Sequence, residues 1–371
     1  MEAAIIRTPM DTEWLDWLRI LAAFAVVALH VSDNLAGSKQ ELASVWWESN
    51  LLDAAVRWCV PVFVMVSGAL LLKARTPEAA PVFFRKRLRR ILLPTVFWTL
   101  FYMVIWIRFG KGITLSKESW NVLTGHPFFH LWYLYMLFGL YLITPFLRTY
   151  MAGARRSEVR VLLIVLFGIS AIDCFWNHCA VSPSDGPFIT LFLPFIGYYL
   201  CGAYLADRET LQKPIKGLRA IITLSILGSA LAQYLVARHF PANQYFRDWL
   251  SPGVIVLSVA LFALLSLERD RWRIASAANR GLLGLMASAS FGIYLIHPVF
   301  VMVLWRVKWL NTGLVPIAAI PLLSILFFVL SLIATLAISE VPLLKEVVAP
   351  RTTWSEWRRS LAKGAGQGTA D

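Results

Sequence analysis

The sequence predicts an all-α, polytopic membrane protein, a helix bundle with about ten transmembrane helices. Of its 371 residues, 58% are hydrophobic and 15% are charged, whereas a soluble domain usually has ~25% charged residues. The apolar residues form blocks that approach the ~20 residues a helix needs to cross the hydrocarbon core. They do not alternate over ~10 residues, as strands of an outer-membrane barrel would. A soluble globular protein, a disordered chain and a disulfide-stapled secreted domain are therefore excluded.

Ten apolar blocks follow one another along the chain, and polar or basic connections separate them. Pro61 is expected to kink the second block, and Ser67-Gly68 suits close helix approach. No internal repeat is visible, which weakens a transporter interpretation. We predict one membrane domain, residues 1–340, and a polar, basic, flexible cytoplasmic tail, residues 341–371. The predicted spans are 14–36, 51–72, 91–109, 129–147, 161–177, 189–206, 218–236, 252–267, 282–305 and 315–338.

The distribution of Lys and Arg predicts the orientation. Most of the 35 basic residues fall on one side of the bilayer if the N-terminus is inside, so both termini are predicted to be cytoplasmic. A net charge of +13 would suggest nucleic acid for a soluble protein. Here the charge lies between apolar blocks, so no nucleic-acid partner is predicted. A signal peptide around residues 20–29 is the alternative at the N-terminus, but Asp11, Glu13 and Asp16 precede it where positive charge is needed.

Ionisable residues inside the spans are the informative ones, because each costs ~2.5–3.5 kcal/mol at the bilayer centre on insertion scales. Arg19 and His30 are eleven residues apart, so on a helix they share a face, ~16 Å apart along the axis. A cation at one end and an imidazole at the other suit a long, phosphate-bearing ligand that enters from inside. In the alternative, Arg19 pairs with Asp16 and His30 makes a structural hydrogen bond. Asp53 and Arg57, spaced i,i+4, are expected to satisfy each other.

A basic run stands at the entrance of the third span. It contains five cations, Arg85, Lys86, Arg87, Arg89 and Arg90. They could simply hold anionic lipid headgroups. They could also bind the phosphates of a nucleotide-like cofactor, because guanidinium groups hold phosphate oxygens bidentately.

Two further stretches are candidates for the site. His130, Trp132 and Tyr133 open the fourth span, where aromatic residues also fit an interfacial belt. Tyr294 and His297 lie in the ninth span, just before Pro298, where a buried histidine is often structural. No metal site is predicted: the six histidines show no zinc spacing, and zinc at Asp173, Cys174, His178 and Cys179 is disfavoured. No G-x-S-x-G elbow, P-loop or dinucleotide fingerprint occurs.

Four motifs in order resemble the acyltransferase-3 family of bacterial integral-membrane O-acyltransferases. They are Trp17-Leu18-Arg19 leading to His30, Val60-Pro61-Val62-Phe63 through Ser67-Gly68, Arg87-Leu88-Arg89-Arg90-Ile91 with Pro94, and Tyr294-Leu295-Ile296-His297-Pro298. The stretches His130-Leu131-Trp132-Tyr133 and Leu142-Ile143-Thr144-Pro145 are similar to those of the stand-alone, WecH-type sugar O-acetyltransferases.

The resemblance implies transfer of an acyl group, usually acetyl, to a hydroxyl of an envelope carbohydrate, in the bacterial cytoplasmic (inner) membrane. The donor would be cytoplasmic acetyl-CoA, with no permanently bound cofactor, and the acceptor a glycan or lipid-linked saccharide. His30 would be the catalytic histidine and Arg19 would help to bind the donor or hold the site. Arg87, Arg89 and Arg90 would bind the donor, and His130, Trp132, Tyr133, Tyr294 and His297 would support the site or bind substrate.

Two other function classes need the same features. A transporter or flippase for a lipid-linked sugar would use a similar cavity, and its cations would bind pyrophosphate. It would move substrate without consuming a thioester. A non-catalytic membrane scaffold would tolerate replacement of Arg19 and His30.

Overall fold

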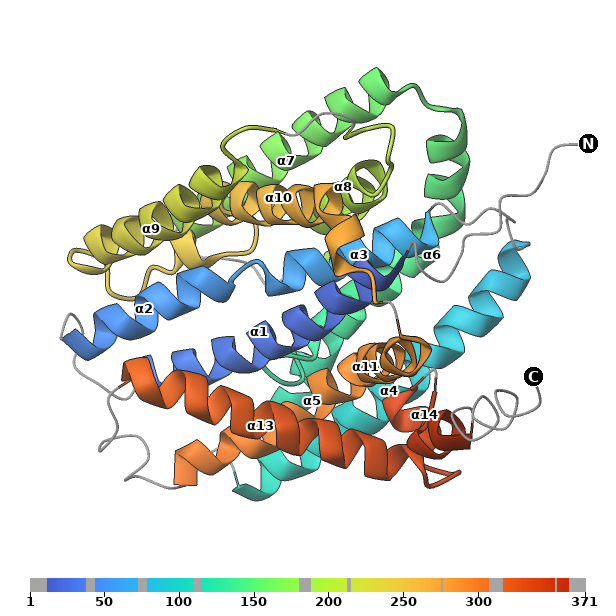
Figure 1. Cartoon of the computed structure of the whole chain (residues 1–371). Coiled ribbons are helices and arrows are strands. Elements are labelled where there is room, and N and C mark those ends of the chain that lie inside the picture. The colour runs from blue at the N-terminus through green and yellow to red at the C-terminus, as the bar shows by residue number, and fades with distance from the viewer. Residues whose placement is uncertain are drawn as a thin grey trace, which may run out of the picture.

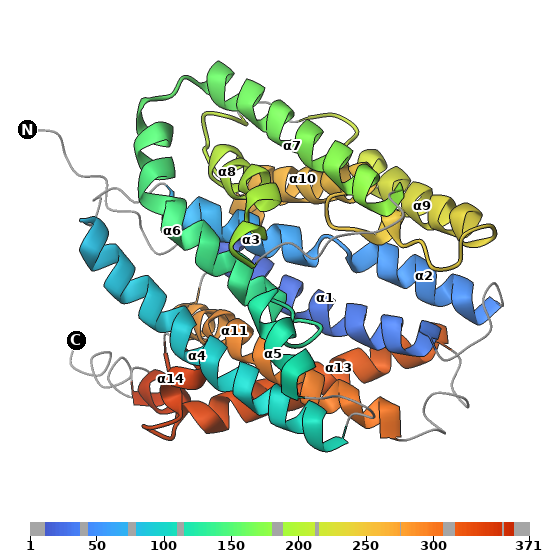
Figure 2. The same ribbon diagram turned by 180° about the vertical axis from the view of Figure 1, so that it is seen from behind.

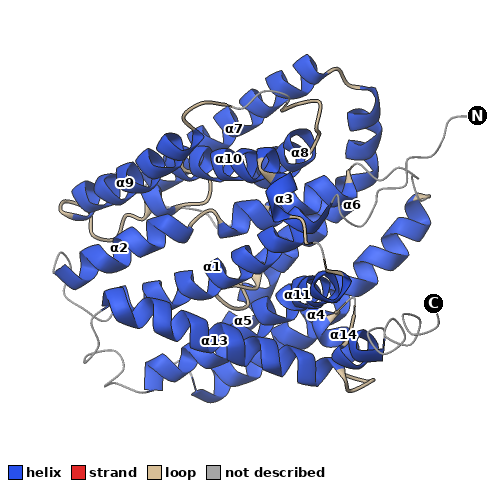
Figure 3. Ribbon diagram, in the orientation of Figure 1, coloured by secondary structure: helices blue, strands red, loops and turns tan. Residues whose placement is uncertain are grey.

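Helices are the regular elements of this chain. The computed structural model describes residues 12–37, 44–72, 79–109, 115–179, 188–211, 215–274, 276–306, 316–350 and 352–359, and within these ranges no strand occurs (Figure 3). The helices are α1 (Glu13–Gly37), α2 (Ser44–Val56), α3 (Cys59–Leu71), α4 (Ala80–Phe109), α5 (Leu115–Leu123), α6 (Trp132–Gly153), α7 (Arg156–Cys179), α8 (Ile196–Leu205), α9 (Leu218–Ala237), α10 (Pro252–Leu267), α11 (Ala277–Arg306), α13 (Pro316–Ser339) and α14 (Lys345–Val348). Short 3-10 turns are η2 (Phe188–Thr190), η3 (Leu193–Phe195), η4 (Tyr245–Arg247) and η5 (Arg269–Trp272).

The predicted fold class is confirmed. Within the described ranges, 8 helical segments are long and apolar enough to cross a membrane. They coincide with eight of the ten predicted spans. The other two predicted spans correspond to α6 and to the shorter apolar segment Leu193–Leu205. The chain is therefore a multi-pass membrane protein.

The second predicted span is broken rather than merely kinked, and it starts earlier than predicted, at Ser44. The helix stops between α2 and α3, at Arg57 and Trp58. Pro61 explains the position of the break, because a proline ring clashes with the carbonyl four residues before it, here that of Arg57. Similarly, α4 starts at Ala80, not at residue 91, because the basic run continues the helix.

Helix α1 lies at the centre of the bundle, between two groups of helices (Figure 1). It packs against α2 and α3 on one side and against α11 and α13 on the other. Helices α7, α8, α9 and α10 form an outer group beside α2 and α3 (Figure 1). Seen from behind, α4 and α6 cover the remaining face of α1 and α11 (Figure 2). Both Arg19 and His30 are thus on a helix that other helices surround.

Glycines bring α3 and α8 into backbone contact. A Cβ at Gly68 would lie 1.8 Å from the carbonyl oxygen of Tyr199, and one at Gly202 would lie 1.9 Å from that of Met65. Only residues without a side chain fit this crossing. The predicted role of Ser67-Gly68 in close helix approach is therefore confirmed for Gly68.

The part of segment 341–371 that the structure describes packs against the bundle. In α14, Val347 and Val348 are buried, and the Trp98 indole nitrogen of α4 donates to the Val347 carbonyl at 2.9 Å. Residues 354–359 form a further helical turn. This first part of the predicted tail therefore belongs to the folded domain, because its apolar residues cover α4. Residues 360–371 lie outside the described residues.

Candidate active site

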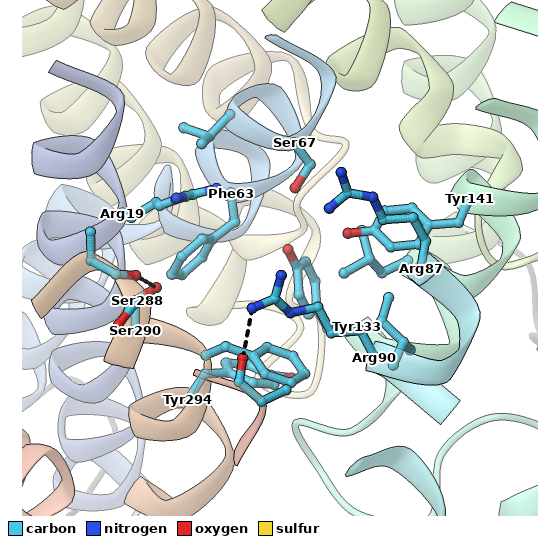
Figure 4. A pocket seen from close by; sticks show the side chains of 16 residues that line it. Arg19, Phe63, Ser67, Arg87, Arg90, Tyr133, Tyr141, Ser288, Ser290 and Tyr294 are labelled. Atoms are coloured by element: carbon cyan, nitrogen blue, oxygen red, sulfur yellow. Dashed lines mark hydrogen bonds between the residues drawn. The ribbon is translucent and has the colours of Figure 1, made fainter. Parts of the chain in front are cut away.

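A cavity near the N-terminal end of α1 gathers the predicted arginines, and we call it the arginine cavity. Arg19 enters it from α1, and Arg87 and Arg90 enter from α4 on the opposite side (Figure 4). Ser67, Ser288 and Ser290 also line it. The structure thus brings together three guanidinium groups from two helices that are far apart in the sequence. Such a site favours an anionic ligand.

The three arginines differ in how they are held. Arg19 pairs with Asp16 at 3.1 Å, the contact that the structural alternative proposed, and still faces the cavity. Arg90 donates to the carbonyl of Ala349, just after α14, at 3.1 Å. The buried Nε of Arg87 has no hydrogen-bond partner among the described residues. An unpaired buried donor on a cation is costly, and a bound anion would satisfy it.

A second, open pocket continues from the arginine cavity, and we call it the basic mouth. Arg85, Lys86, Arg89 and Lys345 line it, with Glu346 as its acidic side chain. Arg90 and Ala349 line both spaces. Arg89 therefore faces the basic mouth and not the arginine cavity. Together the two spaces form a positively charged entrance on one side of the bundle.

A separate cavity of about 540 Å³ lies around His30, and we call it the histidine cavity. This volume is within the range of small-molecule sites, ~300–1,000 Å³. Its walls carry His130, the indoles of Trp106, Trp132 and Trp249, and the polar residues Asp33, Asn34 and Arg57. Aromatic walls with a few polar groups are typical of a site for an amphipathic small molecule.

Three histidines from separate parts of the sequence meet beside this cavity. The ring of His30 stacks on that of His297 with centroids 5.3 Å apart, and His130 lies edge-on to His297 at 5.6 Å. His130 and His297 are buried. Within the described part of the chain, both ring nitrogens of His130 and the Nε2 of His297 are without a hydrogen-bond partner. His30, in contrast, is partly exposed to the cavity.

A network of charges centred on the buried carboxylate of Asp53 holds one wall of the histidine cavity. Arg57 makes two hydrogen bonds to Asp53, at 2.8 and 2.7 Å, as its spacing predicted, and a third contact to Asp33 at 3.4 Å. Arg247 adds ion pairs of 3.6 Å to Asp53 and 4.0 Å to Asp33. The guanidinium of Arg57 lies 5.1 Å from the Trp249 ring centroid.

Sequence reasoning missed that Asp33, Arg57 and Trp249 of this network line the site. It assigned Arg57 to a local pair with Asp53, which is correct as far as it goes. Asp33 is three residues after His30, so the two share a helix face. This spacing could have indicated that Asp33 lies in the site. Trp249 and Arg247 carry no such signal, because they are about 190 residues away from Arg57 in the sequence.

Two tyrosines separate the two cavities. Tyr133 and Tyr294 line both the arginine cavity and the histidine cavity, and their ring centroids are 5.3 Å apart. The Tyr294 hydroxyl donates to the His130 carbonyl. Arg19 and His30 therefore lie on opposite sides of this tyrosine pair. We call the pair the tyrosine partition.

One cluster of metal-type ligands occurs among the described residues, away from both cavities. One ligand atom each of Cys174, His178 and Asp248 lies within 4.8 Å of the others. The Nδ1 of His178 is 2.9 Å from the Cys174 carbonyl, and its Nε2 is 3.8 Å from Asp248. The imidazole thus uses its two nitrogens in different directions and links α7 to the segment before α10.

The arrangement is suited to joining two reactants. An anion with a long arm fits the basic mouth and the arginine cavity. A second, neutral reactant fits the histidine cavity, where an imidazole faces it. Histidine is the usual side chain for accepting a proton from a hydroxyl near neutral pH.

Comparison with known proteins identifies one family. The model described as an acyltransferase domain matches residues 12–341. No curated protein and no solved structure matches the chain.

Proposed function

We infer the function from the premise that the chain belongs to this acyltransferase family. We propose that it transfers an acetyl group from cytoplasmic acetyl-CoA to a hydroxyl of an envelope carbohydrate, in the manner of the stand-alone, WecH-type sugar O-acetyltransferases. Its location would be the bacterial inner membrane, with both termini in the cytoplasm. The observation that carries the proposal is that a cationic cavity and a histidine cavity meet at one pair of tyrosines.

The donor site is proposed on the charged side. The phosphates of acetyl-CoA would bind in the basic mouth, at Arg89 and its neighbours, and at Arg87 and Arg90 in the arginine cavity. The unpaired Nε of Arg87 supports this assignment, since charge-assisted hydrogen bonds to phosphate are strong. Cytoplasmic loops carry the excess of Lys and Arg, which supports placing this side inside.

The acceptor site is proposed in the histidine cavity, which would open to the far side of the membrane. A sugar ring has apolar faces and a rim of hydroxyls. Trp106, Trp132 and Trp249 offer flat apolar surfaces, and Asp33 and Asn34 offer hydrogen-bonding groups. In the network around Arg57, two carboxylates face two guanidinium groups, so it carries no net charge. This balance supports a neutral acceptor.

The proposed reaction breaks one bond and forms one bond at the acyl carbon. His30 takes the proton from the sugar hydroxyl, whose oxygen attacks the thioester carbonyl carbon. The new C–O ester bond forms, the C–S bond breaks, and the thiolate of CoA takes up the proton from His30. In a two-step variant, the His30 imidazole attacks the thioester carbonyl carbon, the C–S bond breaks and the CoA thiolate takes up the imidazole proton. The sugar hydroxyl oxygen then attacks the acetyl carbon, the C–N bond breaks, and the hydroxyl proton returns to the imidazole. Both routes consume one thioester and release one free thiol.

The residues around His30 would position it. His297 stacks against one face of the ring, and Phe129 lies edge-on at 4.7 Å. His130 and His297 would therefore act through the orientation of His30. Holding donor and hydroxyl in one site supplies much of the rate acceleration, because it removes the entropy cost of their encounter.

The test uses the purified protein in vesicles, with acetyl-CoA on the side of the basic mouth and a glycan extract on the opposite side as acceptor. Free thiol release and labelled acetyl on the glycan are measured together. His30→Ala is expected to lower the transfer rate about 10²–10⁴-fold, the usual share of a general base. His239→Ala, at an exposed histidine, is the matched control and keeps the wild-type rate.

The outcomes separate the proposal from its rivals. Wild-type transfer by a folded His30→Ala variant would remove His30 from the mechanism. Movement of a lipid-linked sugar without thiol release would identify a flippase instead. Mass spectrometry of envelope glycans from cells with and without the gene then identifies the acceptor.

A further inference from the structure

The tyrosine partition stands in the path that the proposed reaction requires. The acyl group arrives through the arginine cavity, whereas His30 lines the histidine cavity. We propose that Tyr133 and Tyr294 form a slot that selects the acyl donor by the width of its acyl chain, so that unbranched acyl thioesters are used and branched ones are excluded. This inference rests on the proposed function, because it concerns the donor of the same reaction.

The slot is closed in this structure. The ring centroids of Tyr133 and Tyr294 are 5.3 Å apart with an interplanar angle of 58°. Non-bonded carbon atoms need about 3.5–4.0 Å, so a chain with a ring on each side needs about 7–8 Å between the rings. An acyl group can therefore pass between the two rings only if they separate by about 2–3 Å.

The two tyrosines are held differently, which indicates the one that moves. Burial does not distinguish them, because Tyr133 is 6% and Tyr294 5% exposed. The Tyr294 hydroxyl is tied to a backbone atom, the carbonyl of His130. The hydroxyl of Tyr133 points toward the side chain of Ser67 (Figure 4). A serine hydroxyl can rotate, whereas a backbone carbonyl in the turn just before α6 cannot. Tyr133 is therefore the mobile side of the slot, and Tyr294 is the fixed side.

The neighbours of Tyr133 limit how far it moves. Its ring packs near Phe63 of α3, with centroids 6.2 Å apart, and α3 is locked to α8 through Gly68 and Gly202. A small displacement admits a chain one methylene wide. A branch methyl needs a second displacement against this locked helix. Discrimination over one methyl group in such a pocket is typically 10–200-fold.

The test compares two donors that have the same number of acyl carbons. Butyryl-CoA is straight and isobutyryl-CoA is branched, so they differ in the width of the acyl chain but not in composition. Thiol release that depends on the acceptor is measured for both, with acetyl-CoA as reference. We expect the wild-type protein to prefer butyryl-CoA over isobutyryl-CoA in kcat/KM by about tenfold or more.

Variants of the slot then assign the effect. Tyr133→Ala is expected to lower the butyryl to isobutyryl ratio by about tenfold, because it removes the mobile ring. Tyr133→Phe keeps the ring and is expected to keep the ratio. If the wild type turns over neither four-carbon donor, Tyr133→Ala must gain activity with isobutyryl-CoA.

Two results would overturn the slot. One is a wild-type protein that uses the branched and the straight four-carbon donor equally. The other is a Tyr133→Ala variant that folds, uses acetyl-CoA and leaves the ratio or the lack of branched-donor activity unchanged. In both cases acetyl-CoA turnover persists, so the proposed function would stand. A wild-type protein that does not turn over acetyl-CoA would instead refute the proposed function itself.

Discussion

The crossing of α3 and α8 gives the most direct structural prediction. Gly68→Ala places a Cβ 1.8 Å from the Tyr199 carbonyl oxygen and 2.8 Å from its carbonyl carbon. A carbon and an oxygen normally approach to about 3.3 Å, so the overlap with the oxygen is about 1.5 Å. Both sides of the contact are backbone, so no side-chain rotation relieves it, and the two helices must move apart.

The expected cost lies at the upper end of the range for overpacking, about 3 kcal/mol. It is measured as the loss of folded protein on heating or SDS titration in detergent. Gly168→Ala in α7 is the matched control, since a Cβ there meets nothing within 4 Å. The control is neutral or slightly more stable, because alanine favours a helix interior by up to about 1 kcal/mol over glycine. Equal stability of the two variants would refute the close packing of α3 and α8.

Three further outcomes are expected. Asp53→Ala leaves Arg57 and Arg247 without their shared buried carboxylate and should lower the free energy of unfolding by about 3–5 kcal/mol. The control Asp270→Ala, at an exposed residue that also forms ion pairs, should change it by less than about 1 kcal/mol. Equal losses of stability in the two variants would contradict the network around Asp53. Arg87→Gln should raise the KM for acetyl-CoA about ten- to hundredfold, the worth of one charge-assisted hydrogen bond, while the exposed Arg160→Gln leaves it unchanged; an unaltered KM in Arg87→Gln would place the donor elsewhere. The Thr353 amide and the Lys345 ammonium hold the pKa of the Glu356 carboxyl below its usual range. The Glu356 carboxylate therefore stabilises segment 352–359 at pH values above its ordinary pKa of about 4.3, and this stabilisation is lost as the pH falls through the lowered pKa. The protection of this segment against hydrogen exchange, taken relative to the intrinsic exchange rate at each pH, should fall on acidification in the wild type and less in Glu356→Gln; equal responses would show that another group controls the docking.

Much of the architecture was readable from local patterns. Block length in apolar residues predicts membrane-spanning helices, and every predicted span coincides with helical segments, although the second is split into α2 and α3 and the sixth consists of 3-10 turns and α8. The spacing of Arg19 and His30 placed both on one face of α1, because helical periodicity is a property of neighbouring residues. The spacing of Asp53 and Arg57 predicted their ion pair for the same reason.

The tertiary structure decided what these residues face. Pro61 predicts a disturbed helix, but only the packing shows that the break between α2 and α3 puts Arg57 beside His30 in one cavity. His30 comes from α1, His130 from the turn before α6 and His297 from α11, and nothing in the sequence predicts that their rings meet.

The sequence by itself determined that the chain folds in a lipid bilayer, where its helices lie and which residue types could do the chemistry. Hydrophobicity and helical spacing act over only a few turns, so a local pattern records them. The tertiary structure alone decided that Arg19 and His30 face two cavities instead of one, that Tyr133 and Tyr294 stand between them, and that α14 covers α4. Such contacts join residues more than a hundred positions apart. Their partners are selected by shape and burial across the whole bundle, which no local pattern records.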